Sequence, residues 1–153
     1  MNTHNDDIVQ DLLDLRISHV EALDRRATLG KSEQYYQNAM ISHASVYRNQ
    51  LFARVGNFLE SFEVSITVHG KEISSSCSCG NARKICKHTI ALLYSWVNDS
   101  QDFLNIGKSL QEIQNLDRDR LVEIIVNILR HNPAYIDFFL SKRALEWDEI
   151  EDV

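Results

Sequence analysis

All three cysteines of this 153-residue chain lie in one short window that also contains a histidine. The order is Cys77-Ser78-Cys79, six further residues, and then Cys86-Lys87-His88. Three thiolates and one imidazole form a complete tetrahedral ligand set for Zn²⁺, a metal that favours sulfur and nitrogen ligands. The spacing therefore predicts a site for one Zn²⁺ cofactor, with Cys77, Cys79, Cys86 and His88 as its ligands.

Other roles for clustered cysteines fit this window less well. A disulfide would leave one cysteine over, and two cysteines separated by one residue rarely reach disulfide geometry without strain. A catalytic cysteine needs one thiol and a base rather than three thiols at ligand spacing. Buried, inert cysteines are the structural alternative. Residues 1–14 lack the basic and apolar regions of a secretory signal. We therefore expect a cytoplasmic, reducing location, where clustered cysteines more often bind metal.

Charge is distributed unevenly along the chain, whose formal net charge is −6. Residues 1–30 carry three basic and six acidic side chains, residues 31–98 seven basic and four acidic, and residues 99–153 six basic and twelve acidic. The cysteine-bearing middle is thus basic between acidic flanks. The overall negative charge argues against a protein built wholly to coat nucleic acid. No apolar run approaches the roughly 20 residues that span a bilayer, so we expect no membrane partner.

Nothing in the sequence favours an enzyme. The chain contains no GxxxxGK[ST], HExxH or GxSxG motif. Catalytic zinc needs an open coordination position, whereas the four predicted ligands fill the shell. None of the other histidines has ligand spacing to another ligand-type residue, and we interpret each as a surface or capping residue; they are His4, His19, His43, His69 and His131.

Hydrophobic periodicity predicts the elements that must position the four ligands. A helix should begin at Asn5 or Asp6 and end near Leu29-Gly30, and Ser32 should cap a shorter helix that carries Tyr35 and Tyr36. Alternating apolar residues then predict strands over 41–47, 51–55, 62–68 and 72–76. Because the connections are short, the strands should form an antiparallel meander. Phe58 and Leu59 in the widest loop are expected to fold back over the sheet, and binding of a partner is the alternative.

The predicted zinc ligands fall where the last strand ends and a helix begins. Residues i and i+2 of a strand point to the same side, so Cys77 and Cys79 can converge on one metal. Residues 87–98 show a helical apolar stripe, which places Cys86 at the N-terminus of that helix and His88 in its first turn. The helix dipole favours a thiolate at that position. The strand, the metal loop and the helix thus become one unit held by zinc.

The remaining sequence predicts helices. Ser109 and Glu112 match a capping box, and Asp117 should cap an amphipathic helix through Leu129. Asn132-Pro133 should begin a last helix that runs to Leu145, with three aromatic packing candidates, Phe138, Phe139 and Trp147. The predicted fold class is α+β, a small antiparallel meander and a zinc-bound helix between N-terminal and C-terminal helices. We predict an N-terminal helix over 1–30, a zinc-binding domain over 31–98 and a helical extension over 99–153, which is either a separate unit or docked on the zinc domain.

Several blocks around the cysteines resemble the SWIM zinc finger family, whose ligand pattern is CxC…CxH. The resemblance covers roughly residues 28–98, and its blocks are Tyr35-Tyr36, Leu51–Gly56, Ser75–Cys79 and Cys86–Trp96. More loosely, helices over 109–140 resemble the tail of stand-alone prokaryotic members. The resemblance implies a ββα zinc module that binds nucleic acid or protein. Family members occur in Snf-type ATPases, Mutator-type transposases, recombination-mediator complexes and ubiquitin-pathway proteins.

Two functional hypotheses follow. In the first, the chain is a module that binds DNA or another nucleic acid through Arg83, Lys84 and Lys87, because phosphate binds well to cations near a helix N-terminus. Arg48, Arg54 and Lys71 would extend that basic patch along the sheet. In the second, the chain is an adaptor that binds a partner protein, such as a Snf-type helicase, and does not contact nucleic acid. For each basic residue taken singly, a solvated surface side chain is the alternative.

Overall fold

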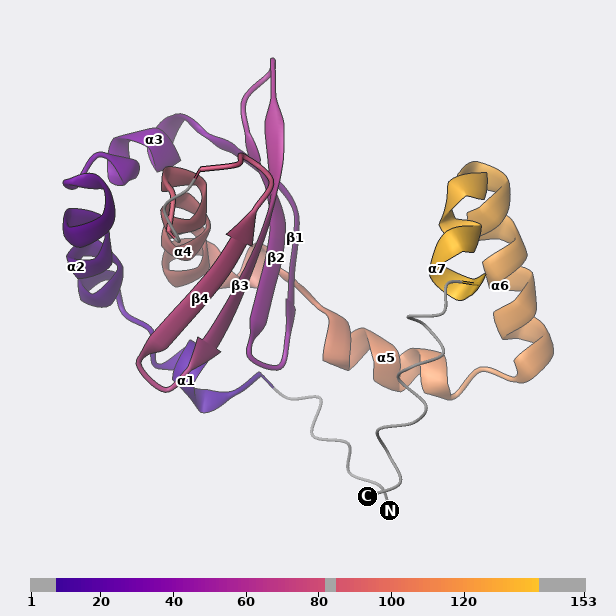
Figure 1. The fold of residues 1–153 in the computed structure, drawn as a ribbon. Coiled ribbons are helices and arrows are strands. Elements are labelled where there is room, and N and C mark those ends of the chain that lie inside the picture. Colours follow the sequence, from indigo (N-terminus) through magenta and orange to yellow (C-terminus); the bar gives the residue numbers. More distant parts are fainter. Residues whose placement is uncertain (1–7, 82–84, 141–153) are drawn as a thin grey trace. The chain divides into compact units, whose positions relative to one another are not determined.

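The structure of the chain, a computed structural model, describes residues 8–81 and 85–140 and confirms the α+β class. The chain divides into two compact units, the first ending at Leu110 and the second beginning at Gln111. The described part of the first unit contains four α-helices, the 3₁₀ turn η1 (Ser100–Asp102) and a sheet, together with the start of a fifth α-helix (Figure 1). Its helices are α1 (Gln10–Leu13), α2 (Ile17–Thr28), α3 (Ser32–Asn38) and α4 (Lys87–Asp99).

The sheet has five strands in the order β4-β3-β2-β1-β5. They are β1 (Met40–Tyr47), β2 (Gln50–Gly56), β3 (Ser61–His69), β4 (Glu72–Cys77) and β5 (Leu104–Asn105). The first four pair antiparallel in sequence order, which confirms the predicted meander. Strand β5 pairs parallel with β1 and was not predicted. Its two residues are too few to show a period in sequence.

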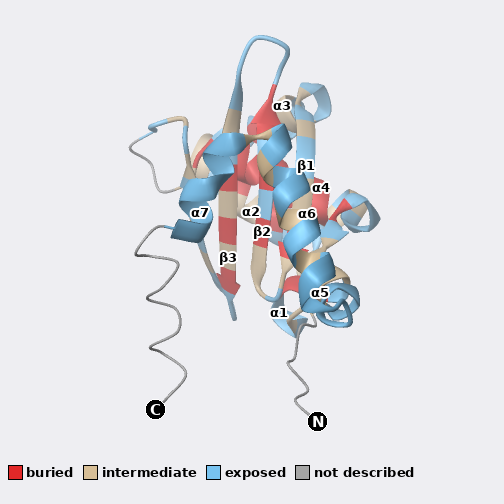
Figure 2. Cartoon of the chain, turned by 90° about the vertical axis from the view of Figure 1, so that its right-hand side faces the viewer, coloured by how far each residue is buried: buried red, intermediate tan, exposed pale blue. Residues whose placement is uncertain are grey.

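One face of the sheet is covered by helices, and the core lies between them. Helix α4 contacts β2, β3 and β4 on one side and α2 and α3 on the other. All nine residues from His88 to Trp96 are buried, so α4 is the central element of the first unit. The buried residues of the strands form one core cluster with those of α4, and Figure 2 colours buried residues red. Because α4 begins directly after Cys86, the core lies next to the candidate metal centre.

The junction of α2, α3 and α4 is organised by the buried carboxylate of Asp24. Its oxygens accept the backbone N–H groups of Ser32 and Glu33, each at 3.2 Å, and the hydroxyl of Tyr94 at 3.1 Å. The hydroxyl of Thr28 also donates to Asp24. The prediction that Ser32 caps α3 was therefore wrong, because Asp24 from the preceding helix accepts the first N–H groups of α3. Ser32 is instead the first residue of α3 and is fully buried.

The N-terminal segment contains two helices where one was predicted. The chain leaves the helical path between α1 and α2, and Asp14 accepts a hydrogen bond from the side chain of Gln10. The carbonyl of Leu12 accepts the indole N–H of Trp96 at 3.0 Å, so the end of α1 is tied to α4. Helix α2 ends at Thr28, followed by left-handed Leu29 and Gly30, close to the predicted end. The predicted caps Asn5 and Asp6 lie outside the described residues.

The hairpin loop between β2 and β3 presents two apolar side chains to solvent. Phe58 is 94% exposed and Leu59 is 95% exposed, so the prediction that they fold back over the sheet was wrong. The side chain of Asn57 accepts the N–H groups of Leu59 and Glu60, and this holds the turn in shape. A Cβ at Gly56 would lie 2.1 Å from the Glu60 carbonyl oxygen, so this close turn requires glycine.

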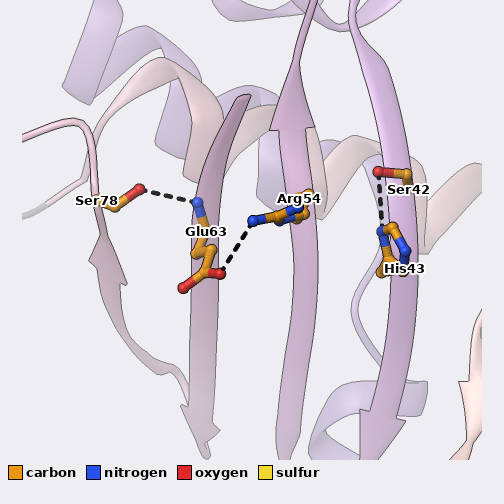
Figure 3. Close-up of polar contacts among 5 residues, drawn as sticks. All are labelled: Ser42, His43, Arg54, Glu63 and Ser78. Atoms are coloured by element: carbon orange, nitrogen blue, oxygen red, sulfur yellow. Dashed lines mark hydrogen bonds and ion pairs between the residues drawn. The ribbon is translucent and has the colours of Figure 1, made fainter. Parts of the chain in front are cut away.

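Among the described residues, no helix of the first unit covers the other face of the sheet, and the side chains there are mostly polar. Figure 3 shows a row of contacts on this face that runs across the strands. Arg54 forms an ion pair with Glu63 at 3.4 Å, and His43 lies 3.3 Å from the Ser42 hydroxyl. His43 has a φ of +53° at a register irregularity in β1. The ion pair is exposed, so we expect it to contribute little to stability.

Helices make up the described part of the second unit. Helix α5 (Ile106–Gln114) crosses the division between the units and is followed by α6 (Arg118–His131), the 3₁₀ turn η2 (Pro133–Tyr135) and α7 (Ile136–Leu140). Asp117 caps α6 and Asn132 caps η2, which confirms both predicted caps. The predicted capping box at Ser109 was wrong, because α5 begins earlier and Asn105 accepts the Lys108 N–H. The expected continuation to Leu145, with Trp147, lies outside the described residues.

None of the helices in the described ranges is both long and apolar enough to cross a bilayer.

Candidate metal centre

The end of β4 brings the first two cysteines together. Ser78 lies between them and continues the ladder with β3, since its N–H donates to the Glu63 carbonyl at 3.0 Å and its hydroxyl accepts the Glu63 N–H at 2.9 Å (Figure 3). This anchoring leaves the side chains of Cys77 and Cys79 on the same side, as the alternation along a strand requires. Gly80 then turns the chain with a φ of +68°, a conformation that favours glycine.

The start of α4 supplies the other two ligand-type residues. Cys86 is the N-cap of the helix, in extended conformation, and its carbonyl accepts the Ile90 N–H at 3.1 Å. His88 lies in the first turn and is buried. The arrangement agrees with the prediction that the helix begins directly after Cys86.

The four ligand-type atoms form one compact cluster. The three sulfur atoms and a ring nitrogen of His88 all lie within 4.8 Å of one another. His88 Nδ1 lies 3.7 Å from the sulfur of Cys77 and 3.7 Å from that of Cys86. Zinc bonds of about 2.3 Å to sulfur and about 2.0 Å to nitrogen give tetrahedral edges of roughly 3.6 Å between sulfur and nitrogen. The observed spacing fits that tetrahedron, so these four side chains can hold one Zn²⁺.

Burial and hydrogen bonding shift the pKa values of the Cys77 and Cys86 thiols in opposite directions. Burial raises the pKa of Cys77 to about 12, so this sulfur holds its proton in the absence of a cation. Burial acts in the same direction on Cys86, but hydrogen bonds from the Thr89 hydroxyl and from the Thr89 and His88 backbone lower its pKa overall. A helix N-terminus stabilises a thiolate in this way. Cys86 therefore loses its proton more easily than Cys77, and Cys77 must release its proton to bind metal.

Aromatic side chains hold the His88 ring in place. The ring of Phe62 packs at 4.4 Å between centroids, and the ring of Tyr35 meets it edge-on at 5.3 Å. Burial lowers the pKa of His88, and the neighbouring Lys87 lowers it further. The imidazole is thus kept neutral, which is the form that binds a metal ion. The orientation of Nδ1 toward the sulfurs makes it the ligand atom.

A second layer of contacts supports the ligands, and the sequence alone did not reveal it. The Thr89 hydroxyl lies 3.5 Å from the Cys86 sulfur and donates to Ser75 Oγ at 3.2 Å, which links α4 to β4. The sequence placed Phe62 only in a strand, although its position on the inner face of β3 follows from the alternation of that strand. Tyr35 belongs to a block that resembles the family, but its contact with His88 depends on how α3 packs on α4.

A pocket of about 370 Å³ adjoins the cluster, lined by Thr28, Leu29, Lys31, Ser32, Asn81, Ile85, Cys86, Lys87 and His88. Two lysines are therefore at its wall. The ammonium group of Lys87 lies 4.6 Å from the centre of the Tyr35 ring, which orients this side chain. The described lining contains these two lysines and no carboxylate, although the charge of Glu60 also acts on His88. The pocket is thus a basic site beside the metal centre.

Only some of the predicted basic residues lie beside the metal centre. Lys87 lies beside the metal centre, whereas Arg83 and Lys84 fall outside the described residues. Arg48 and Lys71 lie in the two turns at the opposite end of the sheet from Cys77, as the strand registers require. Arg54 lies on the uncovered face and is paired with Glu63. These three residues do not extend the basic site, and Lys31, which the sequence did not single out, joins it instead.

The fold and the ligand set together define a module built around a closed Cys₃His zinc site on a strand, a loop and a helix N-terminus. Residues 62–96 match the SWIM zinc finger family. This segment runs from Phe62 to Trp96 and contains all four ligand-type residues, so it is a SWIM zinc finger that binds Zn²⁺. No curated protein and no solved structure matches the chain.

Proposed function

We propose that the protein is a non-catalytic SWIM zinc-finger module that binds the phosphate backbone of nucleic acid at the zinc end of its sheet. The observation that carries the proposal is the pocket beside the metal centre, which combines Lys31, Lys87 and the N-terminus of α4. Cations and the positive end of a helix dipole both favour phosphate. Residues 31–98 hold seven basic and four acidic side chains, which agrees with this partner.

The role of zinc in this proposal is structural. Four protein ligands fill a tetrahedral shell, and zinc catalysis needs an open position. The metal holds the end of β4 against the start of α4, and it thereby keeps Lys87 near Lys31. Since the pocket contains point charges and no arrangement for reading base edges, binding should depend on salt and be independent of sequence.

Fluorescence anisotropy with labelled oligonucleotides at low salt tests the proposal. The combined change of Arg83, Lys84 and Lys87 to glutamine should weaken binding to every oligonucleotide and reduce the logarithmic salt slope by up to about 3. Lys31→Gln should reduce the slope by up to about 1. Lys71→Gln removes the same charge at the far end of the sheet and should leave the slope unchanged. Zinc content should stay constant in all variants, since none of the changed residues is a ligand.

Absence of binding by the wild-type chain, or equal loss in the Lys71→Gln control, would refute a localised phosphate site. A fragment of residues 31–98 lacks the acidic flanks and should bind more tightly than the full chain if it folds.

A second candidate function, a protein adaptor, is supported by the exposed pair Phe58 and Leu59. A rigid loop that presents adjacent apolar side chains, 94% and 95% exposed, is suited to insertion into an apolar pocket of another protein. Pull-downs with nuclease-treated and untreated lysate distinguish the two functions. Recovery of one protein in both arms by the wild type, but not by the Phe58→Ser, Leu59→Ser double variant, would support the adaptor.

A further inference from the structure

Helix α6 carries more apolar surface than the described residues of its own unit cover. Seven of its fourteen residues are Leu, Val or Ile, and none of its residues is buried. A helix that is apolar on most of its surface requires partners on more than one side. The described residues of the second unit supply η2 and α7, and η2 contacts α6 directly. One face of α6 is thereby partly covered.

The apolar side chains of α6 form one continuous arc, which we divide into a first and a second face; Ile128 on the first face is 42% exposed. Leu121, Ile124 and Ile125 lie on one side, and all three are half-buried. Val122 and Val126 lie on another side, at 51% and 43% exposure. Asp119 and Arg130 continue the line of the two valines, since spacings of three and four residues keep a helical stripe on one face. The second face is therefore a stripe of an acid, two valines and a base.

Two copies of this stripe are complementary to each other when their helices run antiparallel. When two copies of α6 lie antiparallel, Asp119 of one comes opposite Arg130 of the other, and Val122 comes opposite Val126. Asp119 and Arg130 are 11 residues apart, or about 16 Å along the helix, so both ion pairs form at once at the two ends of the apolar contact. Within the described residues neither side chain forms an ion pair, whereas the adjacent Arg120 and Glu123 pair with each other.

We propose that the α6 stripe of Asp119, Val122, Val126 and Arg130 is a homodimer interface, and that its partner is the same stripe of a second copy in antiparallel orientation. Such a contact is isologous, because each copy offers the same patch. The antiparallel arrangement also places the positive end of one helix dipole beside the negative end of the other. The association is independent of the proposed phosphate site, which lies in the first unit.

Dimerisation would change how the zinc fingers act. Two zinc fingers in one particle bind a repetitive polymer with a higher apparent affinity than a single one, without any new contact. The contact area of one helix stripe is small, so we expect reversible dimers that form as concentration rises.

Sedimentation equilibrium of the full chain over a range of concentrations tests the interface. The wild type should dimerise, and Asp119→Arg and Arg130→Asp should each raise the dimer dissociation constant at least about tenfold, because each change places two like-charge pairs in the interface. An equimolar mixture of the two single variants should dimerise again. In that mixed dimer the introduced arginine of one copy faces the introduced aspartate of the other, and the second ion pair keeps its original residues. Circular dichroism should show unchanged helix content in each variant.

A separate pair of variants tests the apolar contact without altering charge. Val122→Gln with Val126→Gln should abolish dimers, whereas Phe58→Ser in the first unit should not affect them. A wild-type chain that stays monomeric at all concentrations, single charge variants that dimerise like the wild type, or a mixture that fails to dimerise although both variants are folded would each overturn the proposal. The first outcome would indicate that the stripe is covered within its own chain or by another protein.

Discussion

Helices α4 and α6 have similar lengths, 13 and 14 residues, and both are rich in apolar side chains, yet their environments differ completely. In α4 nine consecutive residues are buried, whereas none of α6 is. Helix α4 contacts three strands and two helices, and zinc joins its N-terminus to β4. Helix α6 has η2 beside it and leaves a stripe exposed. The same kind of sequence therefore serves as a core element in one unit and as an available surface in the other.

Loss of zinc should have the largest effect and should act on α4 and not on α6. Cys79→Ala removes one ligand, and structural zinc sites contribute about 10–16 kcal/mol in small peptides, so even a fraction of that free energy should lower the melting temperature by more than about 10 °C. Hydrogen exchange should become faster in α4 and stay unchanged in α6. Ser76→Ala, in β4 directly before Cys77, should retain one equivalent of zinc. A Cys79→Ala protein with no metal and wild-type stability would contradict the structural role.

The next largest difference between α4 and α6 should be in the stability lost when one apolar side chain of each helix is truncated. Leu92 is fully buried, so Leu92→Ala should lower the free energy of unfolding by about 2–5 kcal/mol. Val126 is 43% exposed, and Val126→Ala should lower the free energy of unfolding by less than about 1 kcal/mol in chains kept monomeric by dilution. Chemical denaturation followed by circular dichroism measures both. Equal costs would show that α6 is as deeply covered as α4.

Replacement of the buried carboxylate should have an intermediate and pH-dependent effect. Burial tends to raise the pKa of Asp24, but hydrogen bonds from Thr28, Ser32 and Tyr94 outweigh it and lower that pKa overall. A lowered pKa in the folded state means that the carboxylate stabilises the fold above the ordinary aspartate pKa of about 3.9, and that this stabilisation is lost as the pH falls below it. Asp24→Asn should therefore lower the free energy of unfolding by about 1–3 kcal/mol at neutral pH and by less below about pH 4.

The difference between wild type and Asp24→Asn isolates this effect, because protonation of the zinc ligands in acid destabilises both proteins alike. Asp102→Asn changes an exposed carboxylate and serves as the matched control. A cost of Asp24→Asn that grows as the pH falls would contradict the assigned direction of the pKa shift.

The smallest effect should come from the serine between the first two cysteines. Ser78→Ala removes the acceptor of the Glu63 N–H and should cost about 0.5–1.5 kcal/mol, with slightly weaker zinc retention in a chelator competition. The hydroxyl of Ser76 points to the same uncovered face and forms no hydrogen bond with the described residues, so Ser76→Ala should be neutral. If both alanine variants behave alike, the ladder at Ser78 does not position the ligands.

Local patterns were sufficient to predict much of the first unit. Strand β3 appears as predicted because Val64, Ile66 and Val68 alternate strictly, and α4 begins where its apolar stripe begins. The metal cluster also follows from local information, since Cys77 and Cys79 share one side of a strand end and Cys86 and His88 share the first turn of a helix. In each case the positions that matter are a few residues apart, so the period of the element alone determines their geometry.

The tertiary structure decided what depends on residues far apart in the chain. Asp24 caps α3 and also accepts from Tyr94, 70 positions away, and Leu12 meets Trp96 across 84 positions, which no periodicity predicts. The exposure of Phe58 and Leu59 follows from a turn held by Asn57, although their apolar character had indicated burial. Lys31 joins Lys87 because α3 packs on α4. The sequence by itself determined the ligand types and the elements that carry them, whereas packing between distant segments determined which side chains surround the metal and which remain exposed.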